Sequence, residues 1–169
     1  MNRLCRTILS ANIILAHLFS YSSAGTIPSG YENIAWNSGV EAVMAKYPKG
    51  QLGKLADELI YRQYKPNQQI ARRNFAFKNG KLHTVSLTFD KRYVEKHGIE
   101  KLLAEHSKLY GEAEVDRSQA PHMISCVWQS DKTRISFAYA PKRPDMTVVI
   151  YEVNRFPVAL PGKELKNPS

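Results

Sequence analysis

Histidines are the side chains of this sequence best suited to hold a metal ion or to move a proton. After residue 24 the chain contains His83, His97, His106 and His122. Zinc and calcium sites need clustered ligands, such as His-Glu-x-x-His, paired cysteines or an aspartate-rich loop, and the sequence has none of these patterns. We therefore expect no metal and no cofactor.

The sequence also lacks the usual motifs of nucleophilic catalysis. There is no Gly-x-Ser-x-Gly elbow and no glycine-rich phosphate loop. Ser38 and Ser125 lie at an expected helix cap and an expected strand start, and Asn79-Gly80-Lys81 is a turn signal. We predict no catalytic residues. An enzyme would be favoured only if folding brought His83 and His122 to a carboxylate in a concave pocket.

Cations and tyrosines gather around one predicted hairpin, and they are the best candidates for binding. Arginine and aromatic side chains are common anchors of protein interfaces. The predicted binding surface consists of Arg72, Arg73, Lys91, Arg92, Tyr61, Tyr64 and Tyr93. A solvated charged face is the competing explanation for the same residues.

The hairpin that positions these residues runs from Arg72 to Asp90. Apolar and polar residues alternate on both sides of Asn79-Gly80, which is the period-2 pattern of half-buried strands. The apolar positions are Phe75, Phe77, Val85, Leu87 and Phe89. The hairpin should therefore bury one face.

The register of the hairpin follows if all five apolar residues share that face. A two-residue turn would pair Phe77 with Leu82 and place the later three residues on the opposite face. We therefore predict a three-residue loop over residues 78–80, with Gly80 left-handed at a bulge. In that register Phe77 lies opposite Lys81.

Hydrophobic periodicity and turn residues place the remaining elements. We expect a helix after Ser38 that buries Met44 among its apolar residues, and a helical turn at 51–57. A longer helix is expected at 92–110, interrupted at Gly98. Strands are expected at 58–64, 124–129, 133–139 and 146–153, and loops at 112–121 and 141–145.

These elements predict an α+β fold whose antiparallel sheet carries its helices on one face. The halves 34–90 and 92–153 show the same order of helix, strand and two-stranded hairpin, which duplication of an α-β-β-β unit would explain. Gly39-Val40-Glu41 and Gly98-Ile99-Glu100 match at the helix starts. Two unrelated amphipathic helices would share such residues as well.

The chain begins with a predicted signal peptide over residues 1–24. Arg3 and Arg6 precede a mostly apolar stretch, which is shorter than the ~17–25 residues of a membrane span. Cleavage after Ala24 would leave 145 of the 169 residues, enough for one domain, which we place at 25–155. Residues 156–169 contain several prolines and are predicted to be a flexible tail.

Cysteine usage and charge indicate the compartment and the partners. Only Cys126 remains after cleavage, so no internal disulfide can form, and we expect it to be a buried small hydrophobe. The absence of an Asn-x-Ser/Thr acceptor whose middle residue is not proline favours a periplasm. The net charge is +9, or +7 without the two arginines of the leader. This charge suits an envelope protein or an anionic envelope component, with at most peripheral membrane contact and no nucleic acid, and solubility alone would explain it equally well.

Two segments resemble small bacterial envelope domains in which a helix precedes a three-stranded meander. The segments are Trp36 to Pro48, WNSGVEAVMAKYP, and Phe77 to Leu82, FKNGKL. The domains include SmpA/OmlA-type outer-membrane assembly lipoproteins and β-lactamase-inhibitor-like domains. The chain departs from the first group because it lacks a lipid-attachment cysteine, and from the second because it lacks their disulfides. The resemblance implies a fold that mainly binds other proteins, and it transfers no functional residue.

The sequence therefore predicts an exported, periplasmic or secreted, non-enzymatic binding or envelope-assembly module. The alternative is a periplasmic envelope hydrolase with a histidine-containing site on the sheet.

Overall fold

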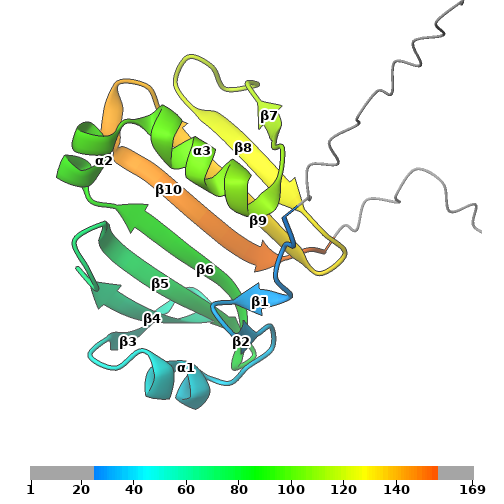
Figure 1. Ribbon diagram of the computed structural model, residues 1–169. Helices are drawn as coiled ribbons and strands as arrows, with labels where there is room; N and C mark the ends of the chain where they lie inside the picture. The colour runs from blue at the N-terminus through cyan, green and yellow to red at the C-terminus, as the bar shows by residue number, and fades with distance from the viewer. Residues whose placement is uncertain (1–24, 156–169) are drawn as a thin grey trace, which may run out of the picture.

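The computed structural model describes residues 25–155, which form an eight-stranded antiparallel sheet with helices packed on one face (Figure 1). The helices are α1 (Val40–Lys46), α2 (Lys91–His97) and α3 (Ile99–Tyr110). The strands of the sheet are β3 (Gln51–Leu55), β4 (Glu58–Tyr64), β5 (Ile70–Lys78), β6 (Lys81–Phe89), β7 (Glu114–Asp116), β8 (Ile124–Gln129), β9 (Thr133–Ala140) and β10 (Arg143–Val153). A separate two-stranded ribbon contains β1 (Gly30–Tyr31) and β2 (Ile34–Ala35). The predicted α+β class and antiparallel sheet are confirmed.

The sheet consists of two four-stranded meanders that join at its centre. The strand order is β3-β4-β5-β6-β10-β9-β8-β7, and Leu87 of β6 lies opposite Val149 of β10 at the join. α1 precedes the first meander, and α2 with α3 precedes the second. The same order of elements therefore recurs in both halves, but each half has one strand more than the predicted α-β-β-β unit.

The hydrophobic core lies between the helices and one face of the sheet, because alternate strand residues point to that face. Its fully buried side chains are Tyr61, Phe75, Phe77, Leu82, Val85, Ile135, Phe137 and Val149 on the strands, with Val43 on α1 and Leu102 on α3. Cys126 is buried in the same cluster, and burial raises the pKa of its thiol. It packs as a small hydrophobe, as predicted.

The predicted register of the first hairpin is wrong at the turn. Phe77 lies opposite Leu82, and the loop has two residues, Asn79 and Gly80. Both have positive φ, 51° and 72°. Asn-Gly is the preferred sequence for a two-residue turn of this kind, because the backbone twist of the turn matches the twist of the strands.

A bulge in β6 nevertheless keeps the predicted core face. Ala76 lies opposite Thr84, so β6 has one extra residue relative to β5. The bulge turns both His83 and Thr84 away from the core, and Leu82 and Val85 on either side of them are both fully buried. The bulge therefore lies within the strand rather than in the loop.

Two edge strands replace other predicted structure. β3 occupies the predicted helical turn at 51–57, and its Leu52 and Leu55 are 49% and 67% exposed. β7 lies within the predicted loop at 112–121, and all three of its residues are exposed. Each of these strands is held by backbone hydrogen bonds to a single neighbouring strand. Their side chains are exposed, so their sequences do not show the alternating apolar pattern of a half-buried strand. β10 likewise begins at Arg143, inside the predicted loop at 141–145.

The second helical segment is built as predicted. The Asp90 carboxylate accepts hydrogen bonds from the backbone N–H groups of Arg92 and Tyr93, at 2.9 and 3.4 Å, and so caps α2. Gly98, with φ of 79°, separates α2 from α3, and Gly111, with φ of 89°, follows α3. Only glycine adopts these conformations without strain.

The first helix differs from the prediction at its start. Gly39 occupies the N-cap position, and the Ser38 hydroxyl instead donates to the carbonyl of Ala35 at 2.8 Å. Met44 is exposed rather than buried. The apolar face of this short helix is therefore narrower than its sequence indicated.

The segment before α1 docks on the second half of the sheet. Ile34 is buried, and the Trp36 indole Nε1 donates to the Thr133 hydroxyl at 2.8 Å. The predicted leader at 1–24 and the predicted tail at 156–169 lie outside the described residues. None of the helices within 25–155 is long and apolar enough to cross a membrane.

Candidate functional site: a basic pocket beside the first helix

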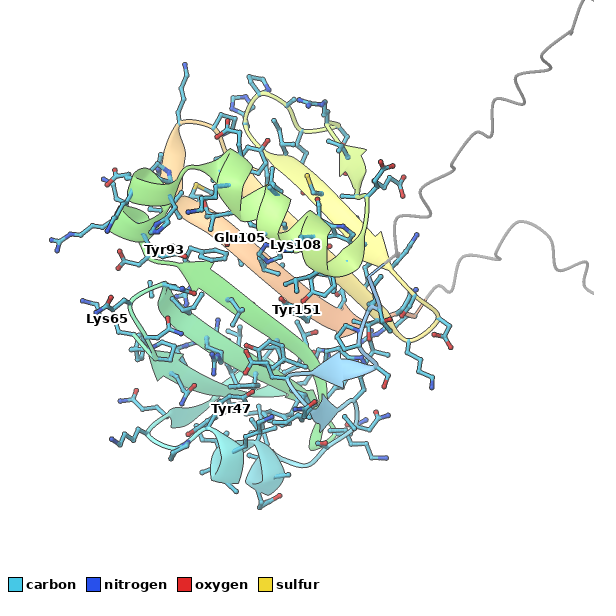
Figure 2. The ribbon with its side chains drawn as sticks, in the orientation of Figure 1. Tyr47, Lys65, Tyr93, Glu105, Lys108 and Tyr151 are labelled. Atoms are coloured by element: carbon cyan, nitrogen blue, oxygen red, sulfur yellow. The ribbon has the colours of Figure 1, made fainter. Side chains whose placement is uncertain are left out.

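A pocket lined by cations lies where the end of α1 meets the β4–β5 loop. Its volume is about 430 Å³. We call it the basic pocket, and its lining consists of Lys46, Tyr47, Pro48, Lys49, Gln63, Tyr64, Lys65, Pro66 and Arg73. Four of these residues are cationic and none is a carboxylate. Figure 2 labels Tyr47 beside α1 and Lys65 on the β4–β5 loop.

Two loops with the same local chemistry form the walls of the pocket. Pro48 ends the helical stretch and is followed by Lys49, while Lys65 precedes Pro66. Lys49 and Lys65 both have positive φ, 67° and 45°. This conformation costs a non-glycine residue about 1–3 kcal/mol, and strained residues of this kind cluster at functional sites.

Arg73 forms the inner wall of the pocket. Its side chain is 92% buried, and the guanidinium lies 4.7 Å from the ring centre of Tyr47 and 5.8 Å from that of Tyr31. Its Nε has no hydrogen-bond partner. A buried polar group without a partner costs about 1–3 kcal/mol, and more when it is charged.

Gln63 lies opposite Arg73 in the β4–β5 pairing and is equally buried. Its Nε2 donates to the carbonyl of Pro48 at 2.7 Å, which fixes the orientation of the amide. The Oε1 at the other end has no hydrogen-bond partner. Each of these two facing residues therefore has one polar atom that is shut off from solvent and has no hydrogen-bond partner.

The Glu32 carboxylate orders the two tyrosines that contact Arg73. Glu32 accepts hydrogen bonds from the hydroxyl groups of Tyr31, at 3.0 Å, and Tyr47, at 2.7 Å. Burial raises the pKa of both phenols, and Glu32 raises it further, so both remain protonated donors at neutral pH. Arg73 also lines a smaller cavity of about 180 Å³, together with Glu32. Arg73 thus lines both cavities.

The structure divides the predicted binding surface. Arg73 and Tyr64 both line the basic pocket, but Tyr64 lies opposite Arg72 in the β4–β5 pairing, so its exposed side chain is on the other face of the sheet from Arg73. Tyr61 is buried, and its hydroxyl donates to the Tyr47 carbonyl at 2.6 Å and accepts from the Gly50 N–H at 2.7 Å, so its role is structural. Arg72 is exposed and points to the opposite face of the sheet from Arg73, because successive strand residues alternate.

The remaining predicted residues lie on or beside α2. Arg92 and Tyr93 line a separate open pocket of about 810 Å³ with residues 67–69 of the β4–β5 loop. Tyr93 stacks on His97, with ring centres 4.0 Å apart. Lys91 is exposed and pairs with Glu95 at 3.7 Å. The β4–β5 loop therefore stands between two parts of a surface that the sequence suggested was continuous.

The histidines do not assemble as the enzyme alternative requires. His83 Nε2 lies 3.2 Å from Glu58 Oε1, and its Nδ1 lies 2.8 Å from the Thr84 hydroxyl, in a pocket of about 390 Å³. His122 is exposed in the β7–β8 connection and does not line that pocket. His106 packs among aromatic rings of the core, and burial lowers its pKa.

Sequence reasoning missed seven of the nine residues that line the basic pocket, among them its three lysines and Gln63. Lys46, Lys49, Gln63 and Lys65 come from the end of a helix, two loops and a strand. The available signal was the pairing of lysine with proline in both loops, Pro48-Lys49 and Lys65-Pro66. Nothing in the sequence indicated that these loops would face each other.

Comparison with known proteins adds one distant likeness. No family model matches the sequence, and no curated protein matches it. Among solved structures, a DUF4309 family protein, YjgB, from Bacillus subtilis is similar, with 15% sequence identity and a TM-score of 0.46. The alignment covers 76% of this chain and 88% of that one. A likeness at this level carries no conclusion about function.

Proposed function

We propose that this protein is an exported, periplasmic binding module without catalytic activity, which holds an anionic envelope component or an acidic face of an envelope protein. The observation that carries the proposal is the basic pocket, which Arg73 and three lysines line together and which no carboxylate lines. Like charges placed together destabilise a fold unless an anion neutralises them. The aromatic residues of the predicted surface, Tyr64 and Tyr93, flank the pocket and its neighbour.

Charge reversal at the mouth of the pocket tests the binding proposal. We expect the purified protein to bind poly-L-glutamate, as a stand-in for an acidic protein surface, in a salt-dependent manner. Lys49→Glu/Lys65→Glu should abolish this binding, because both lysines stand on the pocket walls. Lys101→Glu/Lys108→Glu makes the same change of charge on exposed positions of α3 and should retain most of it. Equal loss in both variants would show that net charge alone attracts the polymer.

Export has its own test. We expect intact-mass analysis of the protein recovered from the envelope to show a chain that begins at Gly25. A mass that includes Met1, or a protein that stays with membranes after a high-salt wash, would contradict the proposed leader and localisation.

A further inference from the structure

We infer that the helix-free face of the sheet binds a second copy of this chain, so that two sheets pack face to face about a two-fold axis. The helices within 25–155 all pack on the other face (Figure 1). The outward-pointing residues of the strands form the helix-free surface, which we call the open face. The inference goes beyond the proposed function, because none of the residues that carry it lines the basic pocket.

Small and apolar side chains occupy the centre of the open face, on β6, β10 and β9. These residues are Ser86, Thr88, Val148, Ile150, Ser136 and Ala138. The outward charges next to them, Arg134 on β9 and Glu152 on β10, pair with each other at 2.8 Å, so the centre has no net charge. A sheet face that stays in water is usually polar, whereas the centre of a protein interface is depleted in charged residues. The centre of the open face therefore has the composition of an interface.

Charges of opposite sign stand towards the two ends of the open face. On β7, Glu114 and Asp116 are exposed and point outward, because the residue between them lies opposite buried Cys126. Arg62 on β4 and Arg72 on β5 also point outward. Within residues 25–155, neither arginine forms an ion pair with a carboxylate, and neither acidic residue forms one with a cation. Each end of the open face is therefore complementary to the other end.

The two charged ends also match in their position along the strands. Residues that lie directly opposite one another share a face and form rows across the sheet. One row runs from Arg62 on β4 to Glu114 on β7, and the next runs from Arg72 on β5 to Asp116 on β7. Rotation about an axis parallel to the strands keeps every residue at the same height along that axis. A two-fold axis in this direction can therefore bring the basic end of one copy onto the acidic end of the other.

An axis that runs along β10 fits both rows. It places β4 of one copy over β7 of the second copy, because three strands separate each of them from β10 or lie between. Arg62 then faces Glu114 of the second copy. Arg72 is one strand spacing away, about 5 Å, from the position that faces Asp116, which an arginine side chain can span. Two-fold symmetry forms the same pair of contacts at the opposite end of the interface.

The same axis packs the centre of the two open faces closely. β6 lies over β9 of the second copy, so Ser86 and Thr88 meet Ser136 and Ala138, and these small side chains allow the sheets to approach. The outward apolar residues of β10 lie on the axis and contact their own copies. The overlap from β4 to β7 covers roughly 600 Å² of sheet per copy, which is close to the roughly 800 Å² per partner of a stable interface. The open face is therefore large enough to hold a dimer.

Sedimentation velocity of the purified protein over a range of concentrations tests the inference. We expect the wild type to form a reversible dimer. Arg62→Glu/Arg72→Glu and Glu114→Arg/Asp116→Arg should each raise the dissociation constant of the dimer at least about tenfold, because like charges then meet at both ends of the interface. A wild type that stays monomeric at every soluble concentration would overturn the inference and leave the open face to another envelope protein. A dimer that neither variant weakens would overturn it as well.

Mixing the two variants separates a lost interface from a lost fold. In a mixed pair the charges are exchanged but complementary at both ends, so native mass spectrometry should show a heterodimer in excess of either homodimer. Lys101→Glu/Lys108→Glu makes a matched change of charge on α3, away from the open face, and should dimerise like the wild type. Absence of the heterodimer, or equal weakening by the α3 control, would overturn the inference.

Discussion

Arg73 keeps a permanent charge inside the protein at a cost in stability. Removing an ion from water costs several kcal/mol even after relaxation of the protein. Cation–π contacts with the rings of Tyr31 and Tyr47, each worth about 0.5–2 kcal/mol, offset part of this cost. An apolar side chain at position 73 would avoid the cost, so stability alone does not explain the arginine, whereas the proposed binding of an anion would use its charge.

Phe77 provides a test of the core at single-residue scale. The side chain is 1% exposed, so Phe77→Ala should reduce the free energy of unfolding by roughly 3–5 kcal/mol. Thr84→Ala lies on the other face and removes only the contact with His83, so it should cost no more than about 1 kcal/mol. Urea denaturation of both variants measures the difference. Similar losses in the two variants would contradict the assignment of faces.

His106 makes stability depend on pH. Its ring packs against Phe137 and Trp128, and burial lowers its pKa below about 6.5, although Glu105 and the Leu102 carbonyl oppose this shift. The folded protein therefore takes up this proton less readily than the unfolded chain, so acid favours unfolding. We expect the free energy of unfolding to fall as the pH drops from 7 to 5.

A variant isolates this contribution from other titrating groups. His106→Phe should show a smaller loss of stability between pH 7 and pH 5 than the wild type, because phenylalanine has no proton to bind. His122→Asn, at an exposed position, should follow the wild-type curve. Parallel curves for the wild type and His106→Phe would contradict the prediction.

At the scale of elements, the sequence predicted the helices and strands in which buried and exposed side chains follow a regular pattern. The strand at 124–129 and the break at Gly98 were placed correctly, because alternating apolar residues and a glycine at a helix end can both be recognised in the sequence. β3 and β7 were missed, since their exposed residues reflect no packing. Leu52 and Leu55 are three residues apart, as on one face of a helix, but both are exposed, so their packing does not favour a helix.

The turn between β5 and β6 depends on backbone conformation rather than on contacts. Gly80 has φ of 72°, and a Cβ atom added there would meet no atom within 4 Å. Gly80→Val should therefore cost about 1–3 kcal/mol through backbone strain alone. Gly80→Asn should cost much less, because asparagine tolerates this conformation. Thermal unfolding of the two variants distinguishes strain from crowding, which would penalise both.

At the scale of the whole molecule, the candidate site shows where sequence reasoning stops. Sequence reasoning identified Arg73 and Tyr64, but it treated Arg73 as a surface residue and Tyr61 as available to a binding partner. Burial of Tyr61 follows from a register that joins β3, β4 and the end of α1, and that register depends on long-range pairing. Local patterns contain no information about such pairing, so the basic pocket could not be assembled from them.

The two halves of the protein should unfold as one unit, because they meet at the centre of a continuous sheet. Leu87→Ala and Val149→Ala lie opposite each other across the join, and a double-mutant cycle should give a coupling of about 0.5–3 kcal/mol. Phe75→Leu and Cys126→Ala lie four strand spacings apart, about 19 Å, and should be additive. Additive losses for the first pair would indicate halves that are stable independently.

The bulge at His83 makes β6 tolerant of a change in length at one position. Removing His83 would restore simple alternation, with Leu82 and Val85 still inward and Thr84 still outward. Removing Ser86 would instead force either Val85 or Leu87 out of the core. We expect the chain without His83 to fold, and the chain without Ser86 to appear only in the insoluble fraction. Soluble expression of the two deletion variants would reveal where this sheet can lose a residue and where it cannot.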